Sequence, residues 1–360
     1  MNEHIAAHIQ KGNQYFAAYR FEEAHSEYSR ALYELQQAGL ALNEAAQAEL
    51  HLMRATALAS ADEQAALSDP DIFNQIIDDY DNAIDLRPEA LHYRNLRGRM
   101  YMNCRFVDYK EEAEKDFEFV LKQNPHEPDA LNMMGLLAAE QQDMDRAIYY
   151  FSLAIEQEPS ADLYASRGMC YFRRMPPAYE VASREFAKAL ELDPKREDLY
   201  LWRAHCFIEL GEEAAALQTY DQLIELAPRA EYFVDRGQTR LTSELEQARN
   251  DFLTAIEMGQ HPLAYNNLAW MLAQEGEYEQ AVQHAETALQ LDPTCTIAYA
   301  TLAEIYALQG KEDAMYEHLA LALQHFYDDY LDVMAEPAFQ PYLQQQRFQQ
   351  LISEMKQRQG

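Results

Sequence analysis

The sequence predicts an all-α protein, and three observations support that prediction. Only 11 of its 360 residues are glycine, and alanine, glutamate, glutamine and leucine, which favour helices, dominate the chain. Extended runs of Val, Ile and Thr, which favour strands, are almost absent. Small and aromatic residues also recur at helical spacing along most of the chain.

One stretch, MMGLLAAEQQDMDRAIYYFSLAIEQEP (133–159), shows this spacing clearly. Gly135 lies within a predicted first helix, although glycine costs about 0.5–1 kcal/mol there relative to alanine. Ala147, Phe151 and Ala154 follow at i, i+4 and i+7, which places them on one face of a second helix. We expect Gly135 to let the two helices approach closely, with Ala147 filling the gap and Phe151 wedged against the next pair. Pro159 then ends the unit.

The same pattern recurs in nine successive registers. A small residue lies near the middle of each first helix: Gly12, Ala55, Gly98, Gly135, Gly168, Ala204, Gly237, Ala269 and Ala303. An early residue of the second helix is small in seven registers: Ala24, Ala113, Ala147, Ala182, Ala216, Ala248 and Ala281, with Ile76 and Met315 in the other two. Four residues later come Tyr28, Tyr80, Phe117, Phe151, Phe186, Tyr220, Phe252, Ala285 and Leu319. Prolines end several units: Pro88, Pro125, Pro159, Pro194, Pro228 and Pro293.

This period of about 34 residues resembles the tetratricopeptide repeat, a helix–turn–helix unit. The resemblance implies a right-handed α-solenoid of about nine units, because no single helix pair buries its apolar face alone. We expect one continuous solenoid over residues 1–325. Its repeats cover approximately residues 5–36, 48–88, 91–125, 128–159, 161–194, 197–228, 230–260, 262–293 and 296–325.

Residues 326–360 are predicted to form a C-terminal capping segment. Phe348, Leu351, Ile352 and Met355 are spaced i, i+3, i+4 and i+7, as in an amphipathic helix. The segment resembles the tail that often closes bacterial proteins of this family, and it would cover the exposed face of the last helix pair. A helix that docks a partner is the alternative.

Three registers carry insertions between their helices, at residues 60–71, 106–112 and 174–180. Turns at the same place in successive repeats emerge on one edge of a solenoid, where they would form an accessory contact surface. Variation of exposed turns without a function is the alternative.

The net charge of −32 argues against nucleic acids and anionic membranes as partners, because both are bound through Lys and Arg. A basic protein partner would be attracted by this field. No secretory signal and no apolar stretch long enough to span a membrane is visible, and the four cysteines lie far apart. A cytoplasmic location with reduced thiols is the simplest interpretation.

The sequence shows no constellation that would support catalysis or hold a cofactor. A glycine-rich phosphate loop, a CxxC pair and a GxSxG elbow are all missing. His4 and His8 lie one helical turn apart, without a third metal ligand in evidence. Cys170 and Cys206 follow the small position of their registers by two residues, so we expect them to be buried. The protein is therefore predicted not to be an enzyme.

The resemblance implies a binding groove lined by the first helices. Carried onto this chain, the groove positions of the family hold His92, Asn95, Arg99, Asn103, Asn132, Met169, Phe172, Arg173, His205, Gln238, Asn266 and Trp270. The leading hypothesis is a non-catalytic bacterial-type scaffold that holds a protein or peptide there. Two alternatives stay open: an acidic inhibitor or antidote that neutralises a basic toxin or enzyme, and an assembly chaperone.

Overall fold

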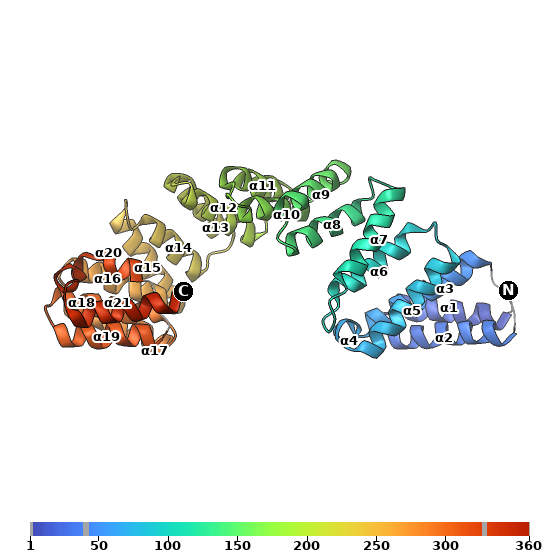
Figure 1. Ribbon diagram of the computed structural model, residues 1–360, viewed down its shortest axis with the longest axis horizontal. Helices are drawn as coiled ribbons and strands as arrows, with labels where there is room; N and C mark the ends of the chain where they lie inside the picture. Colours follow the sequence, from blue (N-terminus) through green and yellow to red (C-terminus); the bar gives the residue numbers. More distant parts are fainter. Residues whose placement is uncertain (1–2, 39–42, 326–329, 360) are drawn as a thin grey trace. The chain divides into compact units, whose positions relative to one another are not determined.

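The computed structural model describes residues 3–38, 43–325 and 330–359, and every regular element within these ranges is a helix (Figure 1). The predicted all-α solenoid class is confirmed. The chain divides into two compact units, Met1–Pro194 and Lys195–Gly360. That the repeats form one continuous solenoid over residues 1–325 stays a prediction.

The first unit contains eleven helices in its described part. They are α1 (Glu3–Ala17), α2 (Phe21–Ala38), α3 (Glu44–Ala61), α4 (Glu63–Ser68), α5 (Pro70–Leu86), α6 (Leu91–Asn103), α7 (Lys110–Gln123), α8 (Pro128–Glu140), α9 (Met144–Gln157), α10 (Ala161–Arg173) and α11 (Tyr179–Leu192). The short α4 lies within the predicted insertion at residues 60–71.

The second unit continues the same alternation of helices. Its described elements are α12 (Glu197–Glu209), α13 (Glu213–Leu226), α14 (Ala230–Arg240), α15 (Leu245–Gly259), α16 (Pro262–Gln274), α17 (Tyr278–Leu291), α18 (Thr296–Leu308), α19 (Glu312–Gln324), α20 (Tyr330–Ala335), the 3₁₀ helix η1 (Pro337–Tyr342) and α21 (Gln346–Gln359).

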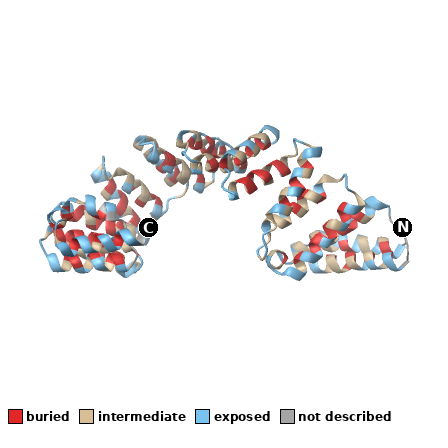
Figure 2. Cartoon of the chain, viewed as in Figure 1, coloured by how far each residue is buried: buried red, intermediate tan, exposed pale blue. Residues whose placement is uncertain are grey.

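The helices pack as nine pairs within the described ranges. The pairs are α1·α2, α3·α5, α6·α7, α8·α9 and α10·α11 in the first unit, and α12·α13, α14·α15, α16·α17 and α18·α19 in the second. First helices also contact the first helix of a neighbouring pair, as α6 and α10 do with α8, and α14 and α18 with α16. Buried residues gather between the packed helices (Figure 2). Each unit thus has a face built from consecutive first helices, which we call the first-helix face.

The packing beside the helical glycines differs from the expectation. A Cβ atom on Gly135 would lie 2.6 Å from the Phe151 ring, so this ring, and not Ala147, occupies the gap. The prediction for Ala147 is wrong because a flat ring can lie directly on a bare glycine, whereas Ala147 is simply buried nearby. The same ring-on-glycine contact recurs in four other pairs: Gly12–Tyr28, Gly98–Phe117, Gly168–Phe186 and Gly237–Phe252.

The prediction that prolines end several repeats is confirmed. The second helices that precede Pro88, Pro125, Pro159, Pro194, Pro228 and Pro293 end two residues before the proline in every case. Left-handed residues make several of the tight turns inside pairs. Gly276 has a φ of 85°, and Gln142 holds the corresponding place of the fourth pair with a φ of 63°. A side chain at this angle costs about 1–2 kcal/mol.

The C-terminal helix covers the last pair, as predicted. Phe348, Ile352 and Met355 on α21 are buried in one cluster with Met315 and Leu319 on α19. The residues of η1 join the same cluster through Phe339 and Tyr342, and the Tyr342 hydroxyl donates to the Ala307 carbonyl at 3.3 Å. The apolar face that the final pair would otherwise expose is therefore packed.

The insertion at residues 106–112 is partly built into the core. The Phe106 ring meets Phe73 edge-on at 5.3 Å between centroids, and Tyr109 stacks on Phe73 at 5.6 Å. The preceding residue, Arg105, contacts the neighbouring insertion, because its amide donates to the Leu67 carbonyl at 2.9 Å. The two insertions at 60–71 and 106–112 thus support one another, and an accessory contact surface stays a prediction.

Candidate functional site

The predicted groove residues of α6 divide into exposed and buried ones. His92, Arg99 and Asn103 are exposed, and their spacing of seven and four residues places them on one side of the helix. Asn95 is only 5% exposed, and its amide donates to Glu127 at 3.5 Å. Asn95 therefore connects its repeat to the turn that begins α8.

The predicted residues of α8 and α10 are more covered. Asn132 and Met169 are half-buried, and Arg173 is exposed. Phe172 is also half-buried and meets the Tyr179 ring edge-on, with centroids 5.2 Å apart. This contact fixes one edge of the Phe172 ring against α11.

Arg99 and Asn103 share a cavity of about 640 Å³ with the insertion that contains α4. Ser60, Glu63 and Arg105 line the same cavity. Acidic and basic side chains therefore face the same space. Sequence reasoning treated the insertion and the groove separately, whereas the structure brings them together.

In the second unit, His205 and Gln238 lie exposed on α12 and α14. The His205 ring nitrogen is 3.3 Å from the carboxylate of Glu209, one turn further along the same helix. Asn266 and Trp270, on α16, belong to a different environment. Asn266 is only 2% exposed and Trp270 is half-buried, and both line a cavity described next.

This second cavity measures about 390 Å³ and lies between α16, α18, α20 and η1, where it also touches the end of α14; we call it the α16–α18 cavity. Its described lining residues are Leu241, Asn266, Asn267, Trp270, Ile297, Ala300, Thr301, Glu304, Val333, Ala335, Glu336 and Phe339. The side-chain oxygen of Asn266 and the amide nitrogen of Asn267 are buried and find no hydrogen-bond partner among the described residues. Such orphaned polar atoms are rare in folded proteins.

Glu304 is the most strongly perturbed carboxyl group of this cavity. It is 7% exposed, and burial together with the nearby Glu336 carboxylate raises its pKa to about 8. Gln274 donates to Glu304 at 2.8 Å, and the Trp270 indole also hydrogen-bonds the carboxyl group; both contacts oppose the shift. At neutral pH the Glu304 carboxyl group is therefore mostly protonated.

A recurring ion pair with a buried acid, called the buried ion pair below, is the polar feature that sequence reasoning missed. In five pairs a basic residue directly before the small position meets an acid directly before the aromatic position. The ion pairs are Lys11–Glu27 (2.8 Å), Arg54–Asp79 (2.7 Å), Arg97–Asp116 (2.6 Å), Arg167–Glu185 (2.6 Å) and Arg236–Asp251 (2.6 Å). Each of these acids is 5% exposed or less. The signal was present in the sequence, one residue before each position already aligned.

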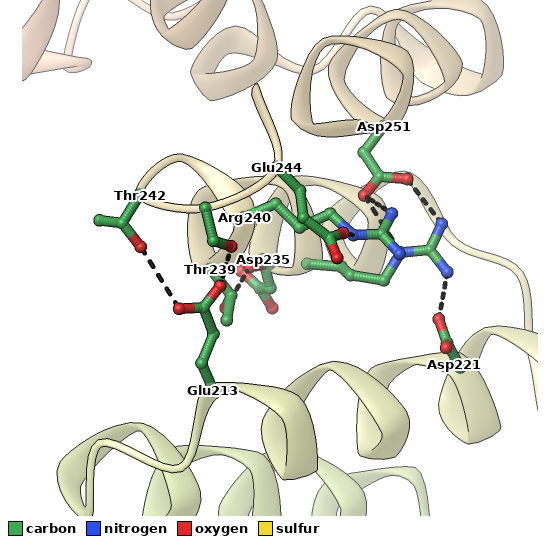
Figure 3. Close-up of polar contacts among 10 residues, drawn as sticks. Glu213, Asp221, Asp235, Thr239, Arg240, Thr242, Glu244 and Asp251 are labelled. Atoms are coloured by element: carbon green, nitrogen blue, oxygen red, sulfur yellow. Dashed lines mark hydrogen bonds and ion pairs between the residues drawn. The ribbon is translucent and has the colours of Figure 1, made fainter. Parts of the chain in front are cut away.

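Several of these arginines also reach the preceding repeat. Arg236 donates to Asp251 of its own pair and to Asp221 of the pair before, the latter at 2.6 Å. Arg240 adds a second contact to Asp251 at 2.7 Å (Figure 3). In the same view Thr242 faces Glu213, to which it donates at 3.4 Å. These contacts tie consecutive repeats together and help to hold the first-helix face in shape.

Cys170 and Cys206 are buried as predicted, and burial raises their pKa values to about 11 and about 12. No group of three or more His, Cys, Asp or Glu residues that could hold a metal occurs among the described residues. His8 contacts Glu27 at 2.6 Å. None of the described helices is both long and apolar enough to cross a bilayer.

Comparison with known proteins points to one family. Residues 110–162, 178–233 and 262–295 each match a tetratricopeptide repeat. Tetratricopeptide repeat protein 13 from Homo sapiens is 27% identical over 171 residues, which cover 45% of this chain and 20% of that protein. Tetratricopeptide repeat protein 6 from Homo sapiens is 27% identical over 188 residues, which cover 51% of this chain and 36% of that protein. This chain thus matches about a fifth and about a third of these two relatives.

Two solved structures of tetratricopeptide repeat proteins were compared with this chain. The C-terminal part of a tetratricopeptide repeat-containing protein from Cytophaga hutchinsonii is 16% identical, with a TM-score of 0.52 over 82% of this chain and 99% of that one. A tetratricopeptide repeat protein from Parabacteroides merdae ATCC 43184 is 22% identical, with a TM-score of 0.48 over 72% of this chain and 94% of that one. At these identities the first likeness concerns the fold alone.

Proposed function

Since this chain is a tetratricopeptide repeat protein, we propose that it is a non-catalytic scaffold that binds a protein or peptide on the first-helix faces of its two units. Proteins of this family generally mediate protein–protein interactions. The observation that carries the proposal is the side-by-side packing of α8 with α6 and α10, and of α16 with α14 and α18. Such packing offers an extended surface with residues from consecutive repeats.

The exposed residues of this face have the chemistry of a peptide-binding surface. Arg99 and Arg173 supply guanidinium groups, which bind carboxylates and backbone carbonyls. Phe172 and Trp270 are half-buried rings, and rings held in this way act as anchors because they lose little freedom on binding. Asn95 is buried and supports this surface, because its hydrogen bond to Glu127 connects two repeats.

A second candidate is an acidic inhibitor or antidote for a basic toxin or enzyme. The net charge of −32 favours it, because a strong field accelerates association with an oppositely charged partner. Association rates at low and high salt distinguish the two functions. A steep loss of rate with salt supports the inhibitor, and a shallow dependence supports the scaffold.

Affinity capture from a lysate of the source organism tests the scaffold proposal. Alanine variants at Arg99, Phe172, Arg173 and Trp270 should weaken retention of the captured partner. Matched controls come from second helices: Tyr149→Ala removes a ring that is 59% exposed on α9, and Arg184→Ala removes an exposed guanidinium on α11. Retention that is unchanged in all four first-helix variants rejects the proposed surface, as does an equal loss in the two controls.

A further inference from the structure

The α16–α18 cavity combines acidic side chains with hydrogen-bonding groups that have no partner among the described residues. Its described lining contains two carboxyl groups, Glu304 and Glu336, and no lysine or arginine. Burial and the nearby Glu336 carboxylate raise the pKa of Glu304, and no described lining residue supplies a compensating cation. Elsewhere in the chain buried acids meet a basic residue, as Asp251 meets Arg236 at 2.6 Å.

The orphaned amide atoms indicate what should lie beside that charge. Asn266 offers an unused acceptor and Asn267 an unused donor, and the two side chains are 2% and 8% exposed. A peptide group carries one donor and one acceptor, so it can satisfy both atoms at once. A buried polar atom without a partner costs about 1–3 kcal/mol, which a bound peptide group would recover.

The apolar part of the wall suits a long side chain with a charged end. Trp270, Ile297 and Phe339 line the cavity together with the glutamates. Lysine and arginine combine an apolar stem with a cationic head, and a cation is attracted by the face of a tryptophan ring. A volume of about 390 Å³ lies at the small end of ligand pockets, which suits one side chain and its peptide group.

We propose that the α16–α18 cavity binds the lysine or arginine side chain of a partner peptide. The cationic head lies between Glu304 and Glu336 beside Trp270, and the flanking peptide group pairs with Asn266 and Asn267. This inference rests on the proposed function and gives it a chemical specificity, since the partner must present a basic residue to the second unit.

The test uses small probes with the full chain, so that no partner needs to be known. N-acetyl-arginine amide and N-acetyl-lysine amide carry the charge and the peptide groups. N-acetyl-citrulline amide has nearly the shape of the first probe without the charge, and butylguanidinium has the charge without peptide groups. The readout is the indole N–H signal of Trp270 in a proton–nitrogen NMR spectrum, identified as the one absent from a Trp270→Phe variant; the chain has two tryptophans.

We expect the arginine and lysine probes to shift this signal to saturation, and the citrulline probe to bind roughly tenfold more weakly. Butylguanidinium should also bind several-fold more weakly, because it leaves Asn266 and Asn267 unpaired. Equal binding of the arginine and citrulline probes overturns the charge assignment. Equal binding of butylguanidinium overturns the assignment of the two asparagines, and the lack of any saturable shift overturns the site.

Variants check the same assignment independently. Glu336→Gln changes a residue at the start of η1 and should weaken the arginine probe, with Glu304→Gln as the second variant. Glu279→Gln on α17 removes an equal charge outside the cavity and should bind as the wild type does. Equal binding in all three variants overturns the proposal. Failure here, with capture still sensitive to Arg99 and Phe172, would reject the cavity and leave the scaffold function standing.

Discussion

The buried ion pairs allow one prediction whose size follows from the structure. Arg167 donates to Glu185 with two nitrogens, at 2.8 and 2.6 Å, and Glu185 is 5% exposed. In the fourth pair of the chain, Met134 and Tyr150 hold the two corresponding positions. The fourth pair therefore shows that uncharged side chains can occupy both positions.

Arg167→Met alone leaves the Glu185 carboxylate buried with one remaining cation, Lys188, at 3.2 Å. Breaking a buried pair by removing one partner costs about 3–5 kcal/mol. Because Lys188 is half-exposed and still contacts the acid, we expect a loss of about 2–4 kcal/mol in local stability. The double variant R167M/E185Y removes both charges and should lie within about 1–2 kcal/mol of the wild type.

Hydrogen exchange of the α10 and α11 amides is the appropriate assay, because it measures the stability of this helix pair itself, and the repeats of an array can open separately. Arg184→Met, which breaks an exposed pair with Glu180 on α11, is the control and should cost less than about 1 kcal/mol. A double variant that exchanges as fast as Arg167→Met, or faster, would refute the idea that the buried charge alone causes the loss.

Three further predictions concern single side chains. Glu304→Gln should raise the free energy of unfolding relative to the wild type by up to roughly 4 kcal/mol at pH 8 and by little near pH 4.5. The reason is that the pKa of Glu304 is raised to about 8, so the folded wild type loses stability as the pH rises between these values. Equal urea midpoints of the two proteins at both pH values would contradict the shift. Gln142→Gly should stabilise the fourth pair by about 1 kcal/mol by relieving the left-handed backbone, and a lower melting temperature would count against it. Gly135→Ala should lower the free energy of unfolding by about 1–2 kcal/mol, because the added Cβ would lie 2.6 Å from the Phe151 ring. Gly259→Ala, whose added Cβ has its nearest neighbour at 3.9 Å, should not destabilise the protein. Thermal melts of the two variants compare these effects, and equal effects would reject the ring contact as the cause.

Much of the fold follows from the sequence because local chemistry decides it. A small residue such as Gly98 in a first helix, with Ala113 and Phe117 four residues apart in the second, defines one helix pair without reference to the rest of the chain. The stop at each proline is equally local, because proline disfavours helical backbone in the residue before it. The prediction that failed concerned which side chain fills the gap beside each helical glycine. That choice depends on the shape of the aromatic ring, which lies on the glycine directly.

The site was harder to predict because it depends on contacts between distant segments. Asn95 and Asn266 hold groove positions of the family, yet both are buried, since neighbouring turns and α18 cover them. The α16–α18 cavity combines residues near 241, 266, 300 and 336, and no local pattern connects them. The buried ion pairs, in contrast, were predictable, because each charge lies beside a position already aligned.

Hydroxyl-radical footprinting of the full chain, free and bound to its captured partner, tests whether the first helices bind that partner. The method measures how fast each side chain is oxidised and therefore how exposed it is. If the partner binds the first helices, Phe172 and Trp270 are oxidised more slowly in the complex, and Tyr149 on α9 is oxidised as before. Protection of Tyr149, with Phe172 and Trp270 oxidised as before, would place the partner on the second helices and refute binding by the first helices.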